Sequence, residues 1–240
     1  MYLLIKPASG ACDLGCKYCF YTDEMSCRSE AVRGMMKTET VSRILGKALE
    51  RCAEHMPPEP LSVGFQGGEP LLAGIDFYRF VCDFVEKNNT RGVRVSYFLQ
   101  TNGTHLDAEF AEFFAAHGFL VGLSVDGPKE YHDRHRVTRD GRSCFNRVMR
   151  AAENMRRAGV EFNTLTVVTS ASATHAQALY GFFARSGFRY QQYIPCVAPF
   201  GAVDNAKLGL DADKYGEFLC RMFDLWYADA CRGESSYVYN

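Results

Sequence analysis

The stretch C-D-L-G-C-K-Y-C, from Cys12 to Cys19, follows the first apolar segment of the chain and contains three thiols. The spacing C-x-x-x-C-x-x-C allows Cys12, Cys16 and Cys19 to converge on one metal site from a single short loop. Cysteine thiolates are the usual ligands of iron–sulfur clusters, and a four-iron cluster normally takes four of them. Three thiols leave one iron open, and an open metal position can bind a small chelating molecule. The spacing therefore predicts a cluster with one open iron.

Zinc and inert cysteines are the alternatives on these residues alone. A structural zinc needs a fourth ligand, and the nearest candidates, Cys27 and His55, lack the usual spacing partner. A disulfide scaffold is disfavoured, because residues 1–6 have neither the basic segment nor the long apolar run of a secretory signal. We expect the 10 cysteines to be reduced thiols or metal ligands.

The composition favours a single globular domain. The chain has 240 residues, of which 47% are hydrophobic and 23% charged, and α/β barrels of this size commonly form one domain. The net charge of −1 does not favour electrostatic binding of nucleic acid or of an anionic membrane. No apolar run reaches the roughly 18–20 residues of a membrane helix. We expect one cytoplasmic domain over residues 1–240, with no nucleic acid or membrane partner.

Short apolar runs alternate with helical patterns along the whole chain. Strands are predicted at residues 2–6, 61–65, 94–99, 119–125, 162–168 and 190–194. Helices are predicted from Thr38, as a capping residue, to the prolines at 57–60, and at residues 75–86, 107–117, 143–158, 175–186 and 212–231. Such alternation implies βαβ crossovers and a parallel sheet, and right-handed crossovers coil six units into a partial (β/α)6 barrel of the TIM type.

The distinctive short motifs all follow predicted strands. They are the cysteine loop after the first strand, G-G-E-P at 67–70, Q-T-N-G at 100–103 and S-V-D-G at 124–127. Ligands of parallel α/β folds bind beyond the carboxyl ends of the strands. The order of the motifs therefore predicts a ligand site at this edge of the sheet.

The same motifs carry a family resemblance. The cysteine spacing, with Tyr18 before and Phe20 after the third cysteine, resembles the signature of the radical S-adenosylmethionine (radical SAM) enzymes. Five strings resemble the anaerobic sulfatase-maturating enzymes over essentially the whole chain: L-I-K-P-A-S (4–9), C-K-Y-C-F-Y (16–21), F-Q-G-G-E-P (65–70), L-Q-T-N-G-T (99–104) and V-G-L-S-V-D-G-P-K-E (121–130). The resemblance implies a radical SAM core with the predicted barrel.

The resemblance also implies cofactors and their ligands. A [4Fe–4S] cluster would be held by the three cysteines, and S-adenosylmethionine would chelate its open iron through the methionine amine and carboxylate. The implied cofactor-binding residues are Gln66, Gly67, Gly68, Glu69, Asn102, Ser124 and Arg150. The alternatives that need no ligand are ordinary turns, a strand-end cap for Ser124 and a solvated helical arginine for Arg150.

The implied activity is reductive cleavage of S-adenosylmethionine to a 5′-deoxyadenosyl radical. In the resembled family this radical abstracts a hydrogen from Cβ of a cysteine or serine of a sulfatase, and oxidation yields Cα-formylglycine. The implied partners are a peptide or unfolded sulfatase and a reduced flavodoxin or ferredoxin-type electron donor, in an anaerobic cytoplasm. A maturase that forms thioethers or epimerises another peptide, and a zinc-stabilised binding module without catalysis, remain alternatives.

The resembled family continues into a cysteine-rich SPASM extension that binds two auxiliary clusters, and this chain stops at Asn240. The resemblance places the catalytic base in that extension, so no general base is assigned here. We expect the chain to bind its cofactors without completing turnover. The charged run H-D-R-H-R at 132–136 is expected either to touch a peptide or to form a solvated loop.

Overall fold

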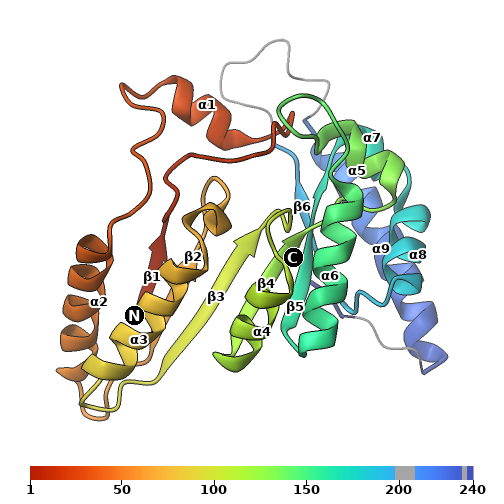
Figure 1. Cartoon of the computed structure of the whole chain (residues 1–240). Coiled ribbons are helices and arrows are strands. Elements are labelled where there is room, and N and C mark those ends of the chain that lie inside the picture. The colour runs from red at the N-terminus through yellow and green to blue at the C-terminus, as the bar shows by residue number, and fades with distance from the viewer. Residues whose placement is uncertain (198–208, 234–236, 240) are drawn as a thin grey trace. The chain divides into compact units, whose positions relative to one another are not determined.

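The computed structural model describes residues 1–197, 209–233 and 237–239 (Figure 1). Its strands are β1 (Tyr2–Ile5), β2 (Leu61–Phe65), β3 (Val95–Thr101), β4 (Phe119–Ser124), β5 (Glu161–Val168), β6 (Tyr190–Pro195) and β7 (Tyr237–Tyr239). Its helices are α1 (Phe20–Ser26), α2 (Thr38–Ala53), η1 (Pro70–Ala73, a 3₁₀ helix), α3 (Ile75–Asn88), α4 (Ala108–Ala116), α5 (Lys129–His135), α6 (Phe145–Ala158), α7 (Ser170–Ala173), α8 (Ala176–Arg185) and α9 (Ala212–Cys231).

The strands are hydrogen-bonded in the order of the chain, from β1 to β7. The pairs β1–β2, β2–β3, β5–β6 and β6–β7 are parallel. The predicted α/β fold with parallel strands is therefore confirmed. The three-residue strand β7 was not predicted, because so short a segment carries no usable periodicity.

The contacts of the chain divide it into two compact units. Unit 1 comprises Met1–Asp13, Glu24–Gly122 and Met149–Glu161, and unit 2 comprises Leu14–Asp23, Leu123–Val148 and Phe162–Asn240. The boundary between Asp13 and Leu14 divides the cysteine stretch. Cys12 therefore belongs to unit 1, and Cys16 and Cys19 belong to unit 2.

Unit 1 is organised around an aromatic core beneath β2. The fully buried Tyr78 of α3 has five aromatic neighbours, with ring centroids 5.2–6.1 Å away for the first four and 6.4 Å for the last: Phe65, Phe77, Phe110, Phe114 and Phe119. Its hydroxyl donates to the Pro70 carbonyl at 2.7 Å, so the core is tied to the first residue of η1. Helices α2 and α3 lie side by side along this part of the sheet (Figure 1).

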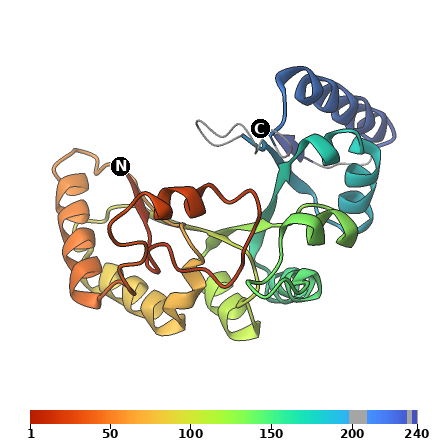
Figure 2. The same ribbon diagram turned by 90° about the horizontal axis from the view of Figure 1, so that it is seen from above.

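Unit 2 is built on β5, β6 and the helix pair α8 and α9, which lie next to each other (Figure 2). Tyr193 of β6 packs edge-on against Phe183 of α8 and Phe218 of α9, with ring centroids 6.1 and 5.4 Å apart. All three side chains are almost completely buried. These contacts fix the helices that follow the carboxyl ends of β5 and β6.

The structure corrects several sequence predictions. Helices α1 and α5 form where no helix was predicted, because such short sequences give no apolar periodicity. Lys37 rather than Thr38 occupies the N-cap of α2, and it makes no capping bond through its side chain. The sequence pattern predicts that Phe77, Phe80, Val81 and Phe84 share the inward face of α3, but Phe80 and Phe84 are only partly buried and stack on each other, whereas Tyr78 is buried.

No helix in the described part of the chain is both long enough and apolar enough to pass through a lipid bilayer.

Candidate cofactor site

Three motifs of unit 1 meet at the carboxyl edge of β1, β2 and β3. These strands are parallel and in register, with Ile5 opposite Phe65 and Phe65 opposite Leu99. The segments that follow them therefore leave the sheet at the same edge, as predicted. Gln66, the first residue beyond β2, donates its backbone N–H to the Ile5 carbonyl at 3.0 Å, and its side chain is half-buried.

The two glycines of the G-G-E-P motif are required by their backbone geometry. Gly67 and Gly68 have φ angles of +98° and +56°, in the region that favours glycine. A Cβ on Gly68 would lie 2.1 Å from the carbonyl oxygen of Ala11. The next residue, Glu69, donates its N–H to that oxygen at 2.7 Å. The motif therefore packs directly on the residue that precedes Cys12.

The carboxylate of Glu69 is buried and joins two loops. Its Oε1 accepts from the Leu71 N–H at 3.0 Å and the Thr101 hydroxyl at 2.7 Å, and its Oε2 accepts from the Asn102 N–H at 2.7 Å. Burial raises the pKa of Glu69 to about 7, and these hydrogen bonds lower it only in part. Glu69 thus holds the T-N-G turn against the G-G-E-P turn.

Asp13, which sequence reasoning missed, lies in the same network. Its Oδ1 accepts from the Asn102 amide at 2.8 Å, and its Oδ2 lies 2.7 Å from the Thr104 hydroxyl and 3.4 Å from His105 Nε2. Burial raises the pKa of Asp13, but the bonds from His105, Thr104 and Asn102 outweigh burial and bring it well below the ordinary value. The Asn102 amide also donates to Cys12 Sγ at 3.7 Å.

The rest of the cysteine stretch is fixed within unit 2. Leu14 pairs with Thr138 in an isolated antiparallel bridge. The Gly15 N–H donates to the Val137 carbonyl at 2.8 Å, and the Cys19 N–H donates to the Cys16 carbonyl at 3.1 Å. The loop that carries Cys16 and Cys19 is therefore held by backbone bonds to the segment after α5.

A buried charged cluster lies beside Cys16. The Arg136 Nε is 3.3 Å from Asp126 Oδ2, and the Tyr18 hydroxyl donates to the same oxygen. The Arg136 guanidinium lies over the Tyr18 ring, 5.6 Å from its centroid, and its Nη1 is 4.0 Å from Cys16 Sγ. Burial raises the pKa of the Cys16 thiol to about 11, which the Arg136 charge partly opposes.

This cluster overturns the expectation of a solvated H-D-R-H-R loop. His132 is 0% exposed and Arg136 8% exposed, because both side chains turn inward from α5 and its end. The His132 Nδ1 accepts from the Asp126 N–H at 3.4 Å, and its Nε2 lies 3.4 Å from Cys144 Sγ.

The two remaining predicted residues lie in different units. Ser124 is buried at the end of β4, in unit 2, and Arg150 is exposed on α6, in unit 1. Their contact with a cofactor stays a prediction.

The donor chemistry of the cysteines fits an iron–sulfur cluster. Cys12, Cys16 and Cys19 form no disulfide and are half-buried, and a donor side chain lies beside each of the first two sulfurs. Thiolates with such donors are typical cluster ligands. Within the described residues, no three histidine, cysteine, aspartate or glutamate side chains form a group that could hold a metal ion. The convergence of the three thiols therefore stays a prediction.

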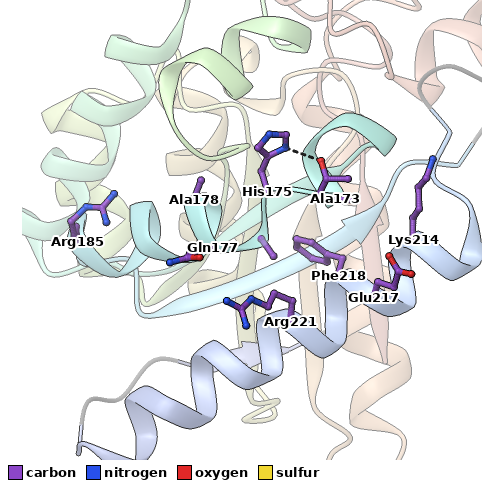
Figure 3. Close-up of a pocket in the computed structure, with 11 residues that line it drawn as sticks. Ala173, His175, Gln177, Ala178, Arg185, Lys214, Glu217, Phe218 and Arg221 are labelled. Carbon is purple, nitrogen blue, oxygen red and sulfur yellow. Dashed lines mark hydrogen bonds between the residues drawn. The ribbon is translucent and has the colours of Figure 1, made fainter.

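A cavity of about 650 Å³ lies between the α7–α8 segment and α9, in unit 2 (Figure 3). Arg185, Lys214 and Arg221 contribute positive charge to its lining, and Glu217 contributes the opposite charge. None of the predicted cofactor or metal residues lines this cavity. The chemistry-bearing groups are instead those of the loops beyond β1, β2, β3 and β4.

Comparison with known proteins matches residues 7–175 to the family described as the radical SAM superfamily. The chain is 40% identical over 232 residues to a cysteine-type anaerobic sulfatase-maturating enzyme of Clostridium novyi (strain NT), covering 96% of this chain and 61% of that protein. It is 30% identical over 241 residues to a serine-type anaerobic sulfatase-maturating enzyme of Bacteroides thetaiotaomicron, covering 94% of this chain and 57% of that protein.

The fold matches a solved structure of native anSMEcpe with bound AdoMet and Cp18Cys peptide. The TM-score is 0.89 at 37% sequence identity, over 99% of this chain and 62% of that one. The expected partial barrel of the radical SAM type is thereby confirmed. The chain spans about three fifths of the length of these relatives.

Proposed function

This chain belongs to the radical SAM superfamily, and we propose that it takes part in the oxidation of a sulfatase cysteine to Cα-formylglycine. A [4Fe–4S] cluster and S-adenosylmethionine are the cofactors of this superfamily, as the sequence predicted. The observation that carries the proposal is the identity, over nearly the whole chain, to cysteine-type sulfatase-maturating enzymes. That identity exceeds the identity to the serine-type enzymes, which favours cysteine as the target.

In this proposal Cys12, Cys16 and Cys19 hold the cluster. When bound, the reduced cluster supplies the electron that splits S-adenosylmethionine into methionine and a 5′-deoxyadenosyl radical. The methionine amine is assigned to the segment of Gly67, Gly68 and Glu69, beside Gln66. Ser124 and Arg150 are assigned to the methionine carboxylate and ribose.

The proposal extends to partners and location. The substrate is a sulfatase peptide or unfolded sulfatase, and no residue of this chain is assigned as the general base. A reduced flavodoxin or ferredoxin-type protein provides the electron, because the cleavage is a one-electron reduction at low potential. Ten cysteines, none of them in a disulfide, suit a reducing cytoplasm with little oxygen.

Anaerobic reconstitution followed by a cleavage assay tests this function. The protein is loaded with iron and sulfide, reduced with dithionite, and incubated with S-adenosylmethionine and a peptide that carries the sulfatase cysteine motif. We expect about four irons per chain and formation of 5′-deoxyadenosine. Cys16→Ala should abolish both, whereas Cys220→Ala, at an exposed position of α9, should change neither.

The outcomes separate the alternatives. Stoichiometric zinc without a sulfide-to-iron charge-transfer band would favour the zinc-stabilised module and contradict the proposal. Unchanged iron content in Cys16→Ala would contradict the ligand assignment. Equal 5′-deoxyadenosine with an unrelated cysteine peptide would favour a maturase of another peptide, such as a thioether-forming or epimerising enzyme. A serine peptide tested beside the cysteine peptide examines the target residue.

A further inference from the structure

The side chain of Asn102, directly after β3, is bonded through both its oxygen and its nitrogen within unit 1. Its Oδ1 accepts from the Thr104 N–H at 2.9 Å and lies 2.7 Å from the Thr104 hydroxyl. Its Nδ2 donates to Asp13 Oδ1 at 2.8 Å and to Cys12 Sγ at 3.7 Å. The Thr104 hydroxyl has a single hydrogen and also lies 2.7 Å from Asp13 Oδ2, so it can donate to only one of these two oxygens. The amide is therefore held by the Thr104 N–H, by Asp13 and by Cys12.

The orientation of this amide follows from its partners. A backbone N–H can only donate, so the atom that faces the Thr104 N–H must be the oxygen. The nitrogen then faces the Asp13 carboxylate, which accepts. Reversing the amide would set two donors against each other at Thr104 and two acceptors against each other at Asp13. The N–H that points at the Cys12 sulfur is therefore fixed by the network.

The backbone of Asn102 is held as firmly as its side chain. Its N–H donates to the buried carboxylate of Glu69 at 2.7 Å, and the side chain is 7% exposed. Glu69 is in turn bonded to the carbonyl of Ala11, next to Cys12, through its own N–H. Asn102 therefore approaches Cys12 from a turn that is itself anchored beside the cysteine.

We propose that Asn102 is a positioning residue for Cys12, whose amide N–H holds the sulfur and raises the reduction potential of the cluster that this sulfur binds. The proposal rests on the proposed function, since it needs Cys12 as a cluster ligand. Reduction adds one electron, and part of that charge resides on the thiolate sulfurs. A hydrogen bond to sulfur stabilises the reduced form more than the oxidised form, and such bonds set cluster potentials. This role differs from direct binding of S-adenosylmethionine.

The test is a redox titration of the reconstituted protein, with the reduced cluster followed by electron paramagnetic resonance. Asn102→Leu removes the amide while filling similar space. We expect the equilibrium constant for one-electron reduction to fall by roughly tenfold, a shift of about 59 mV to lower potential. Asn89→Leu is the matched control, because Asn89 also braces a turn through its amide, with bonds of 2.7 and 2.8 Å to Val93. Its potential should equal that of the unchanged protein.

A second variant keeps the proposal testable if Asn102→Leu does not fold. Asn102→Ser keeps a small polar group that is too short to reach the sulfur, and it should lower the potential in the same direction. The positioning role is supported if both variants melt at the same temperature as Asn89→Leu but bind less iron. Removing a side chain that is hydrogen-bonded to a metal ligand typically weakens metal binding about 10- to 100-fold. Full iron content with unchanged potential in either folded variant would overturn the proposal.

The experiment distinguishes failure of the Asn102 proposal from failure of the proposed function. If the unchanged protein takes up no iron–sulfur cluster, the proposed function fails and the role of Asn102 fails with it. If the unchanged protein holds the cluster and forms 5′-deoxyadenosine, but Asn102→Leu titrates at the same potential, only the role of Asn102 fails. Resonance Raman adds a readout that activity cannot mimic, since loss of the hydrogen bond should raise an iron–sulfur(cysteine) stretching frequency.

Discussion

At the scale of single residues, both the backbone conformation and the packing at Gly68 favour glycine over any other residue. Its φ of +56° disfavours any side chain, and the space for a Cβ is already filled by the Ala11 carbonyl. Backbone atoms cannot yield as the end of a flexible side chain does. The close approach of the G-G-E-P turn to the cysteine loop therefore depends on the absence of a side chain here.

Gly68→Ala should lower the free energy of unfolding by about 2–4 kcal/mol, because it adds steric overlap to backbone strain. Gly92→Ala is the matched control, since Gly92 has a φ of +69° but no atom within 4 Å of an added Cβ. It should cost only about 1 kcal/mol. Urea denaturation of both variants gives the comparison, and equal losses would show that the contact with Ala11 is unimportant.

Arg136 and Asp126 form a buried ion pair in which each side chain supplies the countercharge of the other. Their side chains are 10% and 4% exposed. Arg136→Met should destabilise the protein by about 3–5 kcal/mol, because Asp126 is left buried without a countercharge. The exposed pair of Arg142 and Asp140 is the control, and Arg142→Met should cost less than about 1 kcal/mol.

The double variant Arg136→Met with Asp126→Leu makes this prediction specific. If the uncompensated charge is the cause, the double variant should be more stable than the sum of the two single losses implies. Chemical denaturation of the four proteins gives that coupling, and simple additivity would contradict the account.

At the scale of elements, α5 is a short helix that depends on tertiary contacts. Its residues, K-E-Y-H-D-R-H, have no apolar stripe, and the buried group is His132. Burial lowers the pKa of His132 to about 4, although Asp126 partly opposes this effect. The helix is therefore anchored by a neutral imidazole bonded to the loop after β4.

This anchor should weaken in acid. Above about pH 6.5 the imidazole is neutral in both the folded and unfolded states, so its stabilising contribution is complete. Between about pH 6.5 and 4 the unfolded state binds a proton that the folded state does not, and stability falls by up to about 3 kcal/mol as the pH falls.

His132→Gln should remove this part of the pH dependence, whatever it costs at neutral pH. Unfolding free energies of the unchanged protein and the variant, measured from pH 4 to 8, give the difference. The exposed His55 serves as the control through His55→Gln. A difference between unchanged protein and His132→Gln that does not vary with pH would contradict the burial of a neutral histidine.

At the scale of the whole molecule, cofactor binding should appear as added stability. A ligand that binds only the folded state stabilises it by about 2.7 kcal/mol at a concentration 100 times its dissociation constant. S-adenosylmethionine should therefore raise the melting temperature of the cluster-loaded protein and leave that of Cys16→Ala nearly unchanged. Anaerobic calorimetry measures both, and an equal rise in the two proteins would place the ligand away from the cluster.

The fold was largely predictable because its signals are local. The apolar runs of β2 and the helix α9 were placed with their observed bounds, since length and periodicity decide them. Helices α1 and α5 and strand β7 escaped prediction because they are short and have no apolar repeat. The inward face of α3 was predicted only in part, since Tyr78 rather than Phe80 and Phe84 fills the core.

The sequence by itself determined the alternation of strands and helices, the motifs beyond the strand ends and the trio of thiols with cluster spacing. These features depend on residues that are close together in the sequence, so the periodicity and spacing of residue types reveal them. Only the tertiary structure decided which polar groups satisfy one another. Tyr18 and Asp126 are 108 residues apart, and Cys12 and Asn102 are 90 apart. A buried polar group takes whichever partner the folded chain brings to it, and no local pattern records that choice.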